Sequence, residues 1–303
     1  MSTRVPFIDN TLVLPAGEFA AIIGAHPSRG ARSPVLWNAV YAALGRSCRM
    51  VPFDVAPDRL AEVLAWLDAY PAFVGGAVAV PHKQAVADWL GAARLDPGAQ
   101  GICAVNALSR DGRGQLRGAN TDGLAAAQVL HEAGLAATDT VLVLGFGGAA
   151  RAVVNAVRQQ VARVVVATRR VDDPAAVALS RWMGVELVAP AACGDVLGQA
   201  TVLINGTVLG SAPEHVDACA LPPDFTRHVR QLRLAFDVVY QPADTTFLKA
   251  MPAGVVRLGG SRMNLLQAVL GFQRAHPEVA EEVIEPVMSQ AALAPPPRQG
   301  RAP

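Results

Sequence analysis

The stretch from Val141 to Ala156, VLVLGFGGAARAVVNA, constrains the fold more than any other part of the chain. An uninterrupted run of Val and Leu is typical of a buried parallel strand, and a helix-like pattern follows the glycine cluster. The spacing of Gly145, Gly147 and Ala150 lets the backbone turn sharply and brings main-chain N–H groups close to a pyrophosphate. An ordinary strand-to-helix turn shows the same pattern, so the flanking sequence must distinguish a dinucleotide site from a structural turn.

Composition limits the classes of protein that fit this chain. Its 303 residues are enough for about two domains. With 52% hydrophobic and 17% charged residues, the composition is that of a well-packed α/β protein. A net charge of +1 without blocks of like charge argues against nucleic-acid binding. The four cysteines are dispersed and the histidines lack ligand spacing, so we expect no disulfide, no metal and a reducing compartment.

Two series of strands and helices are predicted. Apolar runs at Phe19–Gly24, 50–53 and Phe73–Val80, each followed by a helical pattern, predict a parallel sheet covered by helices. Residues 104–108 and 115–117 predict a hairpin or a pair of extended segments. The second series begins at Asp139, and its strands are predicted at 141–144, 163–167, 202–205, 234–240 and 255–258. The fold class is therefore α/β with two domains.

The chain ends give further expectations. The N-terminus lacks the basic segment and long apolar core of a signal peptide, and no stretch approaches the ~20 apolar residues that cross a bilayer. We therefore expect a soluble, cytoplasmic protein without membrane contacts. The Pro-rich segment 291–303 has little to bury and predicts a disordered tail.

Lys83 is the first candidate for chemistry. It follows a predicted strand in the sequence VPHK, at the place where an α/β sheet presents its ligand crevice, and a lysine there can donate or accept a proton. Among 26 basic residues only Lys83 and Lys249 are lysines, which weakens the interpretation of Lys83 as one more solvated charge. Lys249 lies in a predicted surface helix and is expected to be solvated.

Four other polar residues lie at informative positions. Asp122 precedes a helical pattern, where an aspartate is ordinarily an N-cap. Asn106 and Gln267 place amides among apolar residues, and a buried amide needs a hydrogen-bond partner, either a ligand or the backbone. Tyr240 ends a predicted strand. Each signal is weak alone.

Taken together, these residues resemble the shikimate/quinate dehydrogenase family over about Phe19 to Phe272. The matching motifs occur in order and at the right spacing: Ser33-Pro34 with Asn38, VPHK, AVN, NTDG, GFGGAARA, Asn205 to Gly210, DVVYQP with Thr245, and GGSRMNLLQA. The resemblance implies a substrate-binding and catalytic domain of residues 1–122 plus 261–290. It also implies an inserted Rossmann-type NADP-binding domain of residues 123–260.

The resemblance also implies roles for individual residues. In such enzymes a ring hydroxyl of a cyclic polyhydroxy acid is oxidised by hydride transfer to a nicotinamide. Lys83 and Asp122 would be the catalytic pair, the carboxylate orienting the amine that shuttles the hydroxyl proton. Asn106 and Gln267 would bind ring hydroxyls, and Ser33 and Tyr240 would face the substrate carboxylate. The residues implied to contact the dinucleotide are Gly145, Gly147, Gly148, Ala149, Ala150, Asn205, Thr207, Gly260 and Met263.

The chain departs from the family pattern where the substrate would bind. Ala31 replaces the first serine of Ser-x-Ser-Pro in a loop one residue longer, and Arg29 and Arg32 are present there. Either arginine can grip a carboxylate or point to water, and we include Arg32 among the substrate-binding candidates. Ala77-Val78-Ala79 replaces Asn-Val-Thr, and a site that loses hydroxyl partners loses discrimination.

Three functions follow as alternatives. The first is an NADP-dependent dehydrogenase of the shikimate/quinate type, a monomer or homodimer acting on a small cyclic hydroxy acid. The second is a related dehydrogenase for a quinate- or aminoshikimate-like acid. The third is a nucleotide-binding homologue that has lost turnover, against which the presence of Lys83 with Asp122 argues.

The cofactor is predicted from the end of the strand after the glycine turn. An NAD enzyme normally carries Asp or Glu there, which binds the ribose 2′-OH. This chain has Thr168, Arg169 and Arg170, with no acid before Asp172. Two arginines and a hydroxyl suit a 2′-phosphate, which predicts NADP with Arg169 as the main contact. The alternative is a pair of solvated loop arginines.

Overall fold

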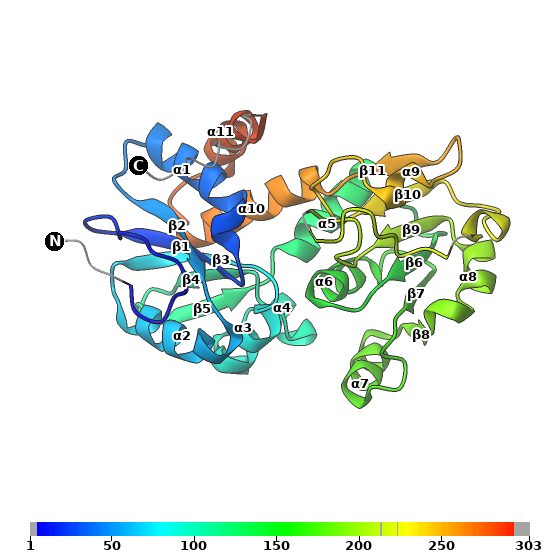
Figure 1. Cartoon of the computed structure of the whole chain (residues 1–303), viewed down its shortest axis with the longest axis horizontal. Helices are drawn as coiled ribbons and strands as arrows, with labels where there is room; N and C mark the ends of the chain where they lie inside the picture. The colour runs from blue at the N-terminus through cyan, green and yellow to red at the C-terminus, as the bar shows by residue number, and fades with distance from the viewer. Residues whose placement is uncertain (1–4, 213, 223, 294–303) are drawn as a thin grey trace. The chain divides into compact units, whose positions relative to one another are not determined.

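The computed structural model describes residues 5–212, 214–222 and 224–293, which form two compact units (Figure 1). The first unit contains the described residues up to Thr121 and from Leu265 onward, and the second contains Asp122–Asn264. The return to the first unit lies inside helix α10 (Ser261–Ala275). The sequence places the two boundaries after Asp122 and after residue 260. Both units are α/β, as the sequence predicts.

A mixed five-stranded sheet forms the centre of the first unit. Its order is β2-β1-β3-β4-β5, with β1 to β3 parallel and the β4–β5 hairpin antiparallel. The hairpin predicted from the sequence is therefore present. The strands are β1 (Phe19–Gly24), β2 (Arg49–Asp54), β3 (Phe73–Val78), β4 (Ala107–Arg110) and β5 (Leu116–Ala119).

Strand β3 lies very close to both of its neighbours because of two glycines. Gly75 has φ +143°, a conformation that side chains disfavour, and a methyl group on Gly76 would lie 1.8 Å from the carbonyl oxygen of Ala21 in β1. The β1–β3 register shifts just before these glycines. After the shift, Ala77 packs on the opposite face of the sheet from Phe73.

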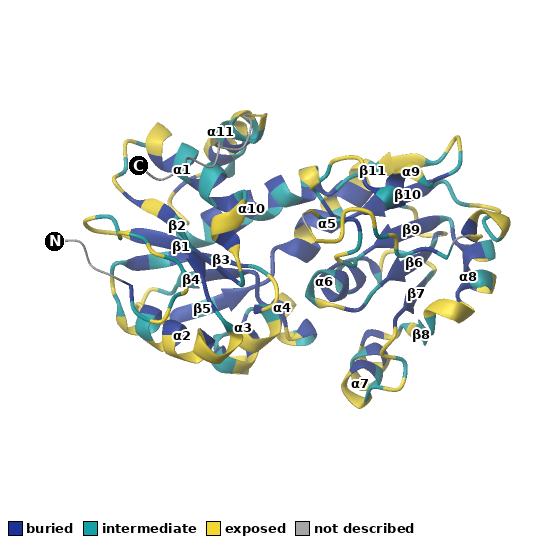
Figure 2. Ribbon diagram, in the orientation of Figure 1, coloured by how far each residue is buried: buried dark blue, intermediate teal, exposed yellow. Residues whose placement is uncertain are grey.

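Each face of this sheet has its own apolar core (Figure 2). One core packs α2 (Leu60–Ala69) and α3 (Lys83–Leu90) on the sheet and centres on Phe19. The other packs α1 (Ser33–Ala43), α10 and α11 (Glu281–Leu293) on the sheet, with Trp37, Tyr41 and Phe272 in edge and tilted contacts. The C-terminal helices therefore complete the first unit.

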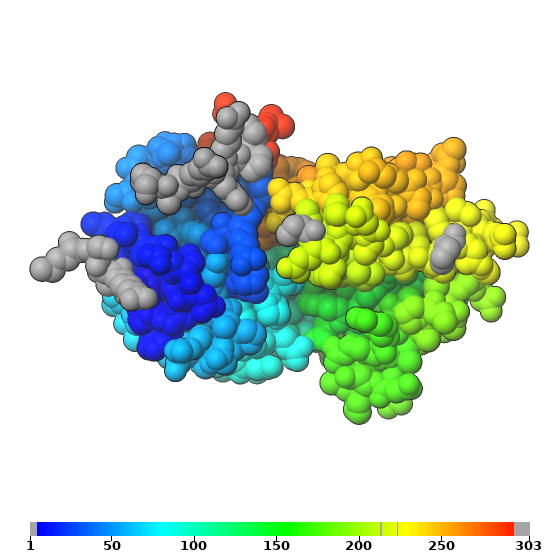
Figure 3. Space-filling view, in the orientation of Figure 1, coloured from blue at the N-terminus to red at the C-terminus, as the bar shows by residue number. Residues whose placement is uncertain are grey.

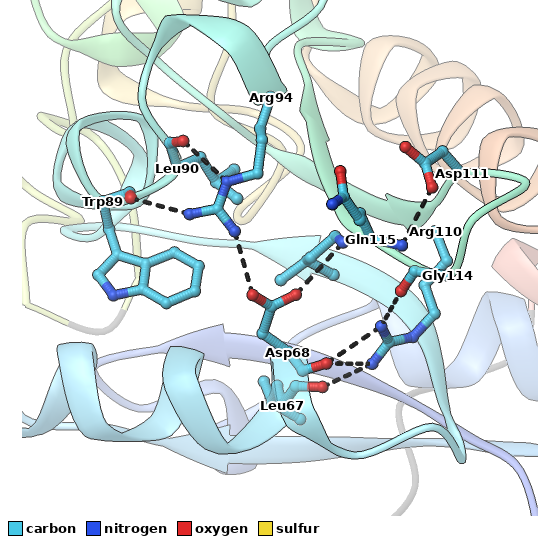
Figure 4. A network of polar contacts seen from close by, with 10 residues as sticks. Leu67, Asp68, Trp89, Leu90, Arg94, Arg110, Asp111, Gly114 and Gln115 are labelled. Atoms are coloured by element: carbon cyan, nitrogen blue, oxygen red, sulfur yellow. Dashed lines mark hydrogen bonds and ion pairs between the residues drawn. The ribbon is translucent and has the colours of Figure 1, made fainter.

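A single arginine ties the end of α2 to the hairpin (Figure 4). Arg110 ends β4, and its guanidinium donates to carbonyl oxygens at the C-terminus of α2, at the start of β3 and in the hairpin turn. The acceptors are Leu67, Asp68, Tyr70, Phe73 and Gly114. These bonds satisfy carbonyl groups at the end of α2 that have no partner within the helix. They lie at the amino end of β3, whereas ligands of such sheets bind at the carboxyl ends of the strands, so we interpret the network as structural.

The second unit contains a six-stranded, wholly parallel sheet in the order β11-β10-β9-β6-β7-β8. This is the strand order of a doubly wound dinucleotide fold, and its switch point lies between β6 and β9. The strands are β6 (Thr140–Leu144), β7 (Arg163–Ala167), β8 (Glu186–Val188), β9 (Val202–Asn205), β10 (Leu234–Asp237) and β11 (Val256–Leu258). The helices of this unit are α5 (Asp122–Glu132), α6 (Gly148–Val157), α7 (Pro174–Met183), α8 (Gly194–Gln199) and α9 (Thr246–Lys249).

In the space-filling view of Figure 3, side chains cover the spaces between the ribbons of the second unit, whose described residues run from green to orange. The three-residue strand β8 and the six-residue helices α4 (Pro97–Ile102) and α8 were not predicted. Such short elements carry too few residues to show a period.

The predicted tail is wrong at its start. Helix α11 continues to Leu293 because Ala291 and Ala292 pack on the apolar core around α1. The remaining residues of that predicted tail, 294–303, lie outside the described residues. Within the described ranges, no helix is long and apolar enough to span a membrane, and no group of three or more His, Cys, Asp or Glu side chains forms a metal cluster.

Candidate functional site

Lys83 is the first residue of α3 and is half-buried. Its carbonyl oxygen accepts the N–H of Val105 at 2.9 Å. The neighbouring His82 is buried, and its Nε2 lies 2.8 Å from the carbonyl oxygen of Val55. Hydrogen bonds therefore fix the backbone at Lys83 and the side chain beside it.

The first unit also contains a polar cluster of Asn106, Thr121 and Gln267, which includes both amides predicted from the sequence. Asn106 Nδ2 donates to Thr121 Oγ1 at 2.9 Å and to Gln267 Oε1 at 3.3 Å. Thr121 donates two hydrogen bonds. Its N–H donates to Asn106 Oδ1 at 2.7 Å, and its hydroxyl donates to the carbonyl oxygen of Gln267 at 3.0 Å. The structure thus brings together residues 161 positions apart in the sequence. Thr121 lies in the NTDG motif, but nothing in that motif predicts this bridging position.

Asp122 directly follows the anchored Thr121 and begins α5, in the second unit. It is 5% exposed. A carboxylate in the first turn of a helix is favoured by the unpaired N–H groups and the helix dipole. The backbone that leads into Asp122 is held by Asn106, through the N–H of Thr121.

The loop before α1 contains the other substrate-binding candidates of the first unit. Ser33 is buried at the first position of α1, while Arg29 is exposed. Arg32 donates from Nη2 to the carbonyl oxygen of Ala292 at 2.5 Å, so part of its guanidinium holds α11. Tyr240, the remaining candidate, lies in the second unit and is half-buried.

Asp54 is a residue of this region that the sequence did not reveal. It ends β2, is 7% exposed, and accepts the N–H and hydroxyl of Ser28 at 2.9 Å and 2.5 Å. The carboxylate therefore orders the loop that leads to Ser33. An aspartate at the end of a strand has no distinguishing sequence pattern.

The three alanines noted in the sequence all lie beside one apolar core. Ala31, Ala77 and Ala79 are half-buried and pack on the cluster that includes Trp37 and Leu265. Val78, between two of them, donates its N–H to the carbonyl oxygen of Asn106 at 2.8 Å. The backbone between Ala77 and Ala79 is therefore hydrogen-bonded to the backbone of Asn106.

The glycine turn of the second unit has the shape that a dinucleotide requires. Gly145 has φ +93°, and a methyl group there would lie 2.8 Å from Thr207 Cγ2. A methyl group on Gly147 would meet nothing within 4 Å, and no side chain caps the N-terminus of α6. Open space and free N–H groups at a helix N-terminus fit an anionic pyrophosphate. Gly148 and Ala150 are the first and third residues of this helix.

The predicted 2′-phosphate residues follow β7. Thr168 is buried, and its Oγ1 accepts the N–H of Arg170 at 3.2 Å. Arg170 pairs with Asp173 at 3.0 Å, and Asp173 also caps α7 through the N–H of Ala176. Hydrogen bonds from that N–H and from Arg170 lower the pKa of Asp173. Arg169 is exposed.

Two predicted cofactor residues lie at the start of α10. The N–H of Gly260 donates to the carbonyl oxygen of Val239 at 3.0 Å, and a methyl group on Gly260 would lie 2.3 Å from the carbonyl oxygen of Val238. Met263 is buried. The second unit therefore contains Gly260 and Met263 together with Asn205, Thr207 and the glycine turn.

Comparison with known proteins agrees with both units. Residues 22–108 match the family model of the shikimate dehydrogenase substrate binding domain. The chain is 36% identical to shikimate dehydrogenase (NADP(+)) of Moorella thermoacetica over 83% of this chain and 85% of that one, and 37% identical to the same enzyme of Oleidesulfovibrio alaskensis over 84% and 88%. A crystal structure of shikimate 5-dehydrogenase from Thermus thermophilus with NADP(H) and shikimate superposes with a TM-score of 0.75 at 28% identity, covering 90% of this chain and 99% of that one. This chain belongs to the shikimate dehydrogenase family.

Proposed function

We propose that this chain is an NADP-dependent dehydrogenase that interconverts a ring hydroxyl and a ketone of shikimate or a closely related cyclic hydroxy acid. The observation that carries the proposal is the Asn106–Thr121–Gln267 cluster, which joins a buried and a half-buried amide at the end of the first sheet. The open glycine turn of the second unit and the 36% identity to an NADP(+) shikimate dehydrogenase support it. The predicted cytoplasmic location and the monomeric or homodimeric state are parts of the same proposal.

The proposed chemistry divides between the two units. NADP, when bound, supplies the hydride acceptor, and the glycine turn with Thr168, Arg169 and Arg170 would hold it. Lys83 takes the proton of the ring hydroxyl during oxidation and returns it during reduction, and the carboxylate of Asp122 stabilises its charged form. Asn106 and Gln267 hold ring hydroxyls, because an amide can both donate and accept a hydrogen bond.

A second substrate class is favoured by Ala77 and Ala79, which stand where the family pattern has polar residues. Ala77 and Ala79 offer methyl groups where a hydroxyl of a bound ring would need a hydrogen-bond partner. A ring acid with a C–H bond or a different substituent toward these alanines fits better there. A quinate- or aminoshikimate-like acid is therefore the alternative substrate.

The test is a panel of cyclic hydroxy acids, each assayed with NADP and with NAD through the absorbance of the reduced nicotinamide. We expect turnover with NADP and at least one acid of the shikimate type. A protein that binds NADP but turns over none of the acids would instead be a catalytically impaired nucleotide-binding homologue. The ratio of rates for shikimate and the alternative acids decides between the two substrate classes.

Replacing both Arg169 and Arg170 by Ala is expected to weaken NADP binding at least about tenfold, because charge-assisted hydrogen bonds to a phosphate are lost. NAD lacks the 2′-phosphate, so its affinity should change little. The Kd of each cofactor is measured by titration. Arg181→Ala, an exposed arginine on the neighbouring α7, is the matched control and should change neither value. Equal weakening of NADP and NAD by the double variant would contradict the assignment.

A further inference from the structure

We propose that Asp237 is a positioning residue for the cofactor, which sets the orientation of the Asn205 amide and through it holds Thr207 against the glycine turn. This inference rests on the proposed function, in which that turn binds NADP. It assigns a role to a residue that makes none of the expected cofactor contacts itself.

Two polar side chains lie at the ends of the neighbouring strands β9 and β10. Asn205 is the last residue of β9 and Asp237 is the last residue of β10, and the two are partners in the parallel register. Asn205 Nδ2 donates to Asp237 Oδ1 at 2.9 Å, and both side chains are 0% exposed. Nδ2 also donates to the carbonyl oxygen of Leu209 at 3.1 Å. The carboxylate and this carbonyl together hold the amide nitrogen, so the amide oxygen is directed to the other side.

That oxygen anchors Thr207. Asn205 Oδ1 accepts the N–H of Thr207 at 3.1 Å and its hydroxyl at 2.7 Å. The same hydroxyl accepts the N–H of Leu209 at 3.1 Å, so both its donor and an acceptor position are used. With the hydroxyl fixed in this way, the methyl group of Thr207 lies against Gly145, 2.8 Å from the position of an added Cβ. A continuous set of contacts thus connects Asp237 to the glycine turn.

A carboxylate is the side chain that enforces this arrangement. Oδ1 of Asp237 also accepts the N–H of Val239 at 3.0 Å, and Oδ2 accepts the hydroxyl of Thr245 at 2.6 Å. In the carboxylate form both oxygens can only accept, so Asp237, like the carbonyl oxygen of Leu209, takes the nitrogen of the Asn205 amide. With the amide reversed, two oxygens would face each other and Thr207 would lose its acceptor.

Burying the Asp237 carboxylate is not favourable for the stability of the folded protein. Among the described residues it has no ion-pair partner, and burial raises its pKa. A buried carboxylate without a cation is unfavourable for folding at neutral pH. Hydrogen bonds from Asn205, Val239 and Thr245 hold the carboxylate, and the bond from Asn205 is the one that connects it to the glycine turn.

Asp139 provides a matched control at the opposite end of the same sheet. It is 3% exposed, precedes β6, and accepts hydrogen bonds from Thr201, from the N–H of Ala136 and from Arg233. It is therefore a buried aspartate with a comparable number of partners, far along β6 from the glycine turn.

The experiment compares equilibrium titrations of each purified protein with NADPH, read by nucleotide fluorescence, with circular dichroism as a check on folding. Asp237→Ala is expected to raise the Kd of NADPH about tenfold, the effect of losing a hydrogen bond to a charged group. Asp139→Ala is expected to lower the melting temperature and leave the Kd within about twofold, since its contacts lie at the other sheet end. Asp237→Asn should restore a Kd within about threefold of wild type, because the N–H of Val239 selects its oxygen for the Oδ1 position.

The outcomes separate this inference from the function on which it rests. If the wild-type protein does not bind NADPH, the proposed function fails. If the wild type binds and folded Asp237→Ala binds equally well, the inference is overturned. Should Asp237→Ala not fold, Thr245→Val decides, because it removes the hydroxyl that holds Asp237 Oδ2, and Thr245 makes none of the expected cofactor contacts. Weaker NADPH binding by folded Thr245→Val supports the inference, and unchanged binding overturns it.

Discussion

Lys83→Ala is expected to lower kcat about 10²- to 10⁴-fold, the contribution of a positioned proton-transfer group. The Kd of NADPH should stay close to the wild-type value, because Lys83 lies in the first unit and the glycine turn lies in the second. The backbone at Lys83 is held through its carbonyl oxygen by Val105 and does not depend on the side chain. Steady-state kinetics with the best acid of the panel, together with NADPH titration, measure both quantities.

The composition of the chain supplies the control for this prediction. Lys249 is the other lysine, and it is exposed at the end of α9 with a long 3.8 Å ion pair to Asp244. An exposed pair of this kind contributes little to stability, so Lys249→Ala should have wild-type kcat and fold. A wild-type rate in Lys83→Ala would show that another group moves the proton. An equal loss in both variants would point to a general effect of lost charge.

The sequence predicted those parts of the fold and site that depend on local patterns. The Val141–Ala156 stretch was interpreted correctly as strand, turn and helix because a buried parallel strand and a glycine turn both have local signatures. The strand order of the second unit then follows the doubly wound pattern. The amides of Asn106 and Gln267 were identified because a polar residue interrupting an apolar run needs a partner.

Contacts between distant segments could not be predicted in this way. Thr121 was visible only as part of a motif, and its bonds to Asn106 and Gln267 need three segments folded together. Asp54 and Asp237 end their strands like many other residues, and only the neighbouring loops give them a role. Arg32 is a substrate-binding candidate from its sequence position, and its bond to the carbonyl oxygen of Ala292, 260 positions away, is a contact that no local pattern predicts.

The strongest expected effect on folding is that of Gly76→Ala in the first sheet. The added methyl group would lie 1.8 Å from the carbonyl oxygen and 2.8 Å from the carbonyl carbon of Ala21, its partner in β1. Both clashing atoms belong to the backbone of a central strand, so no side-chain rotation relieves them. Relief requires β1 and β3 to separate, which breaks the pairing that supports both apolar cores of this unit.

We expect Gly76→Ala to lower the free energy of unfolding by about 3 kcal/mol or more, at or above the upper range for inserting a methylene into a packed site. For a unit of this size that corresponds to a fall in melting temperature of about 10 °C, measured by circular dichroism. Gly112→Ala is the matched control, because a methyl group on this exposed hairpin glycine meets nothing within 4 Å. An unchanged melting temperature for Gly76→Ala would mean that β1 and β3 are not in van der Waals contact at this point.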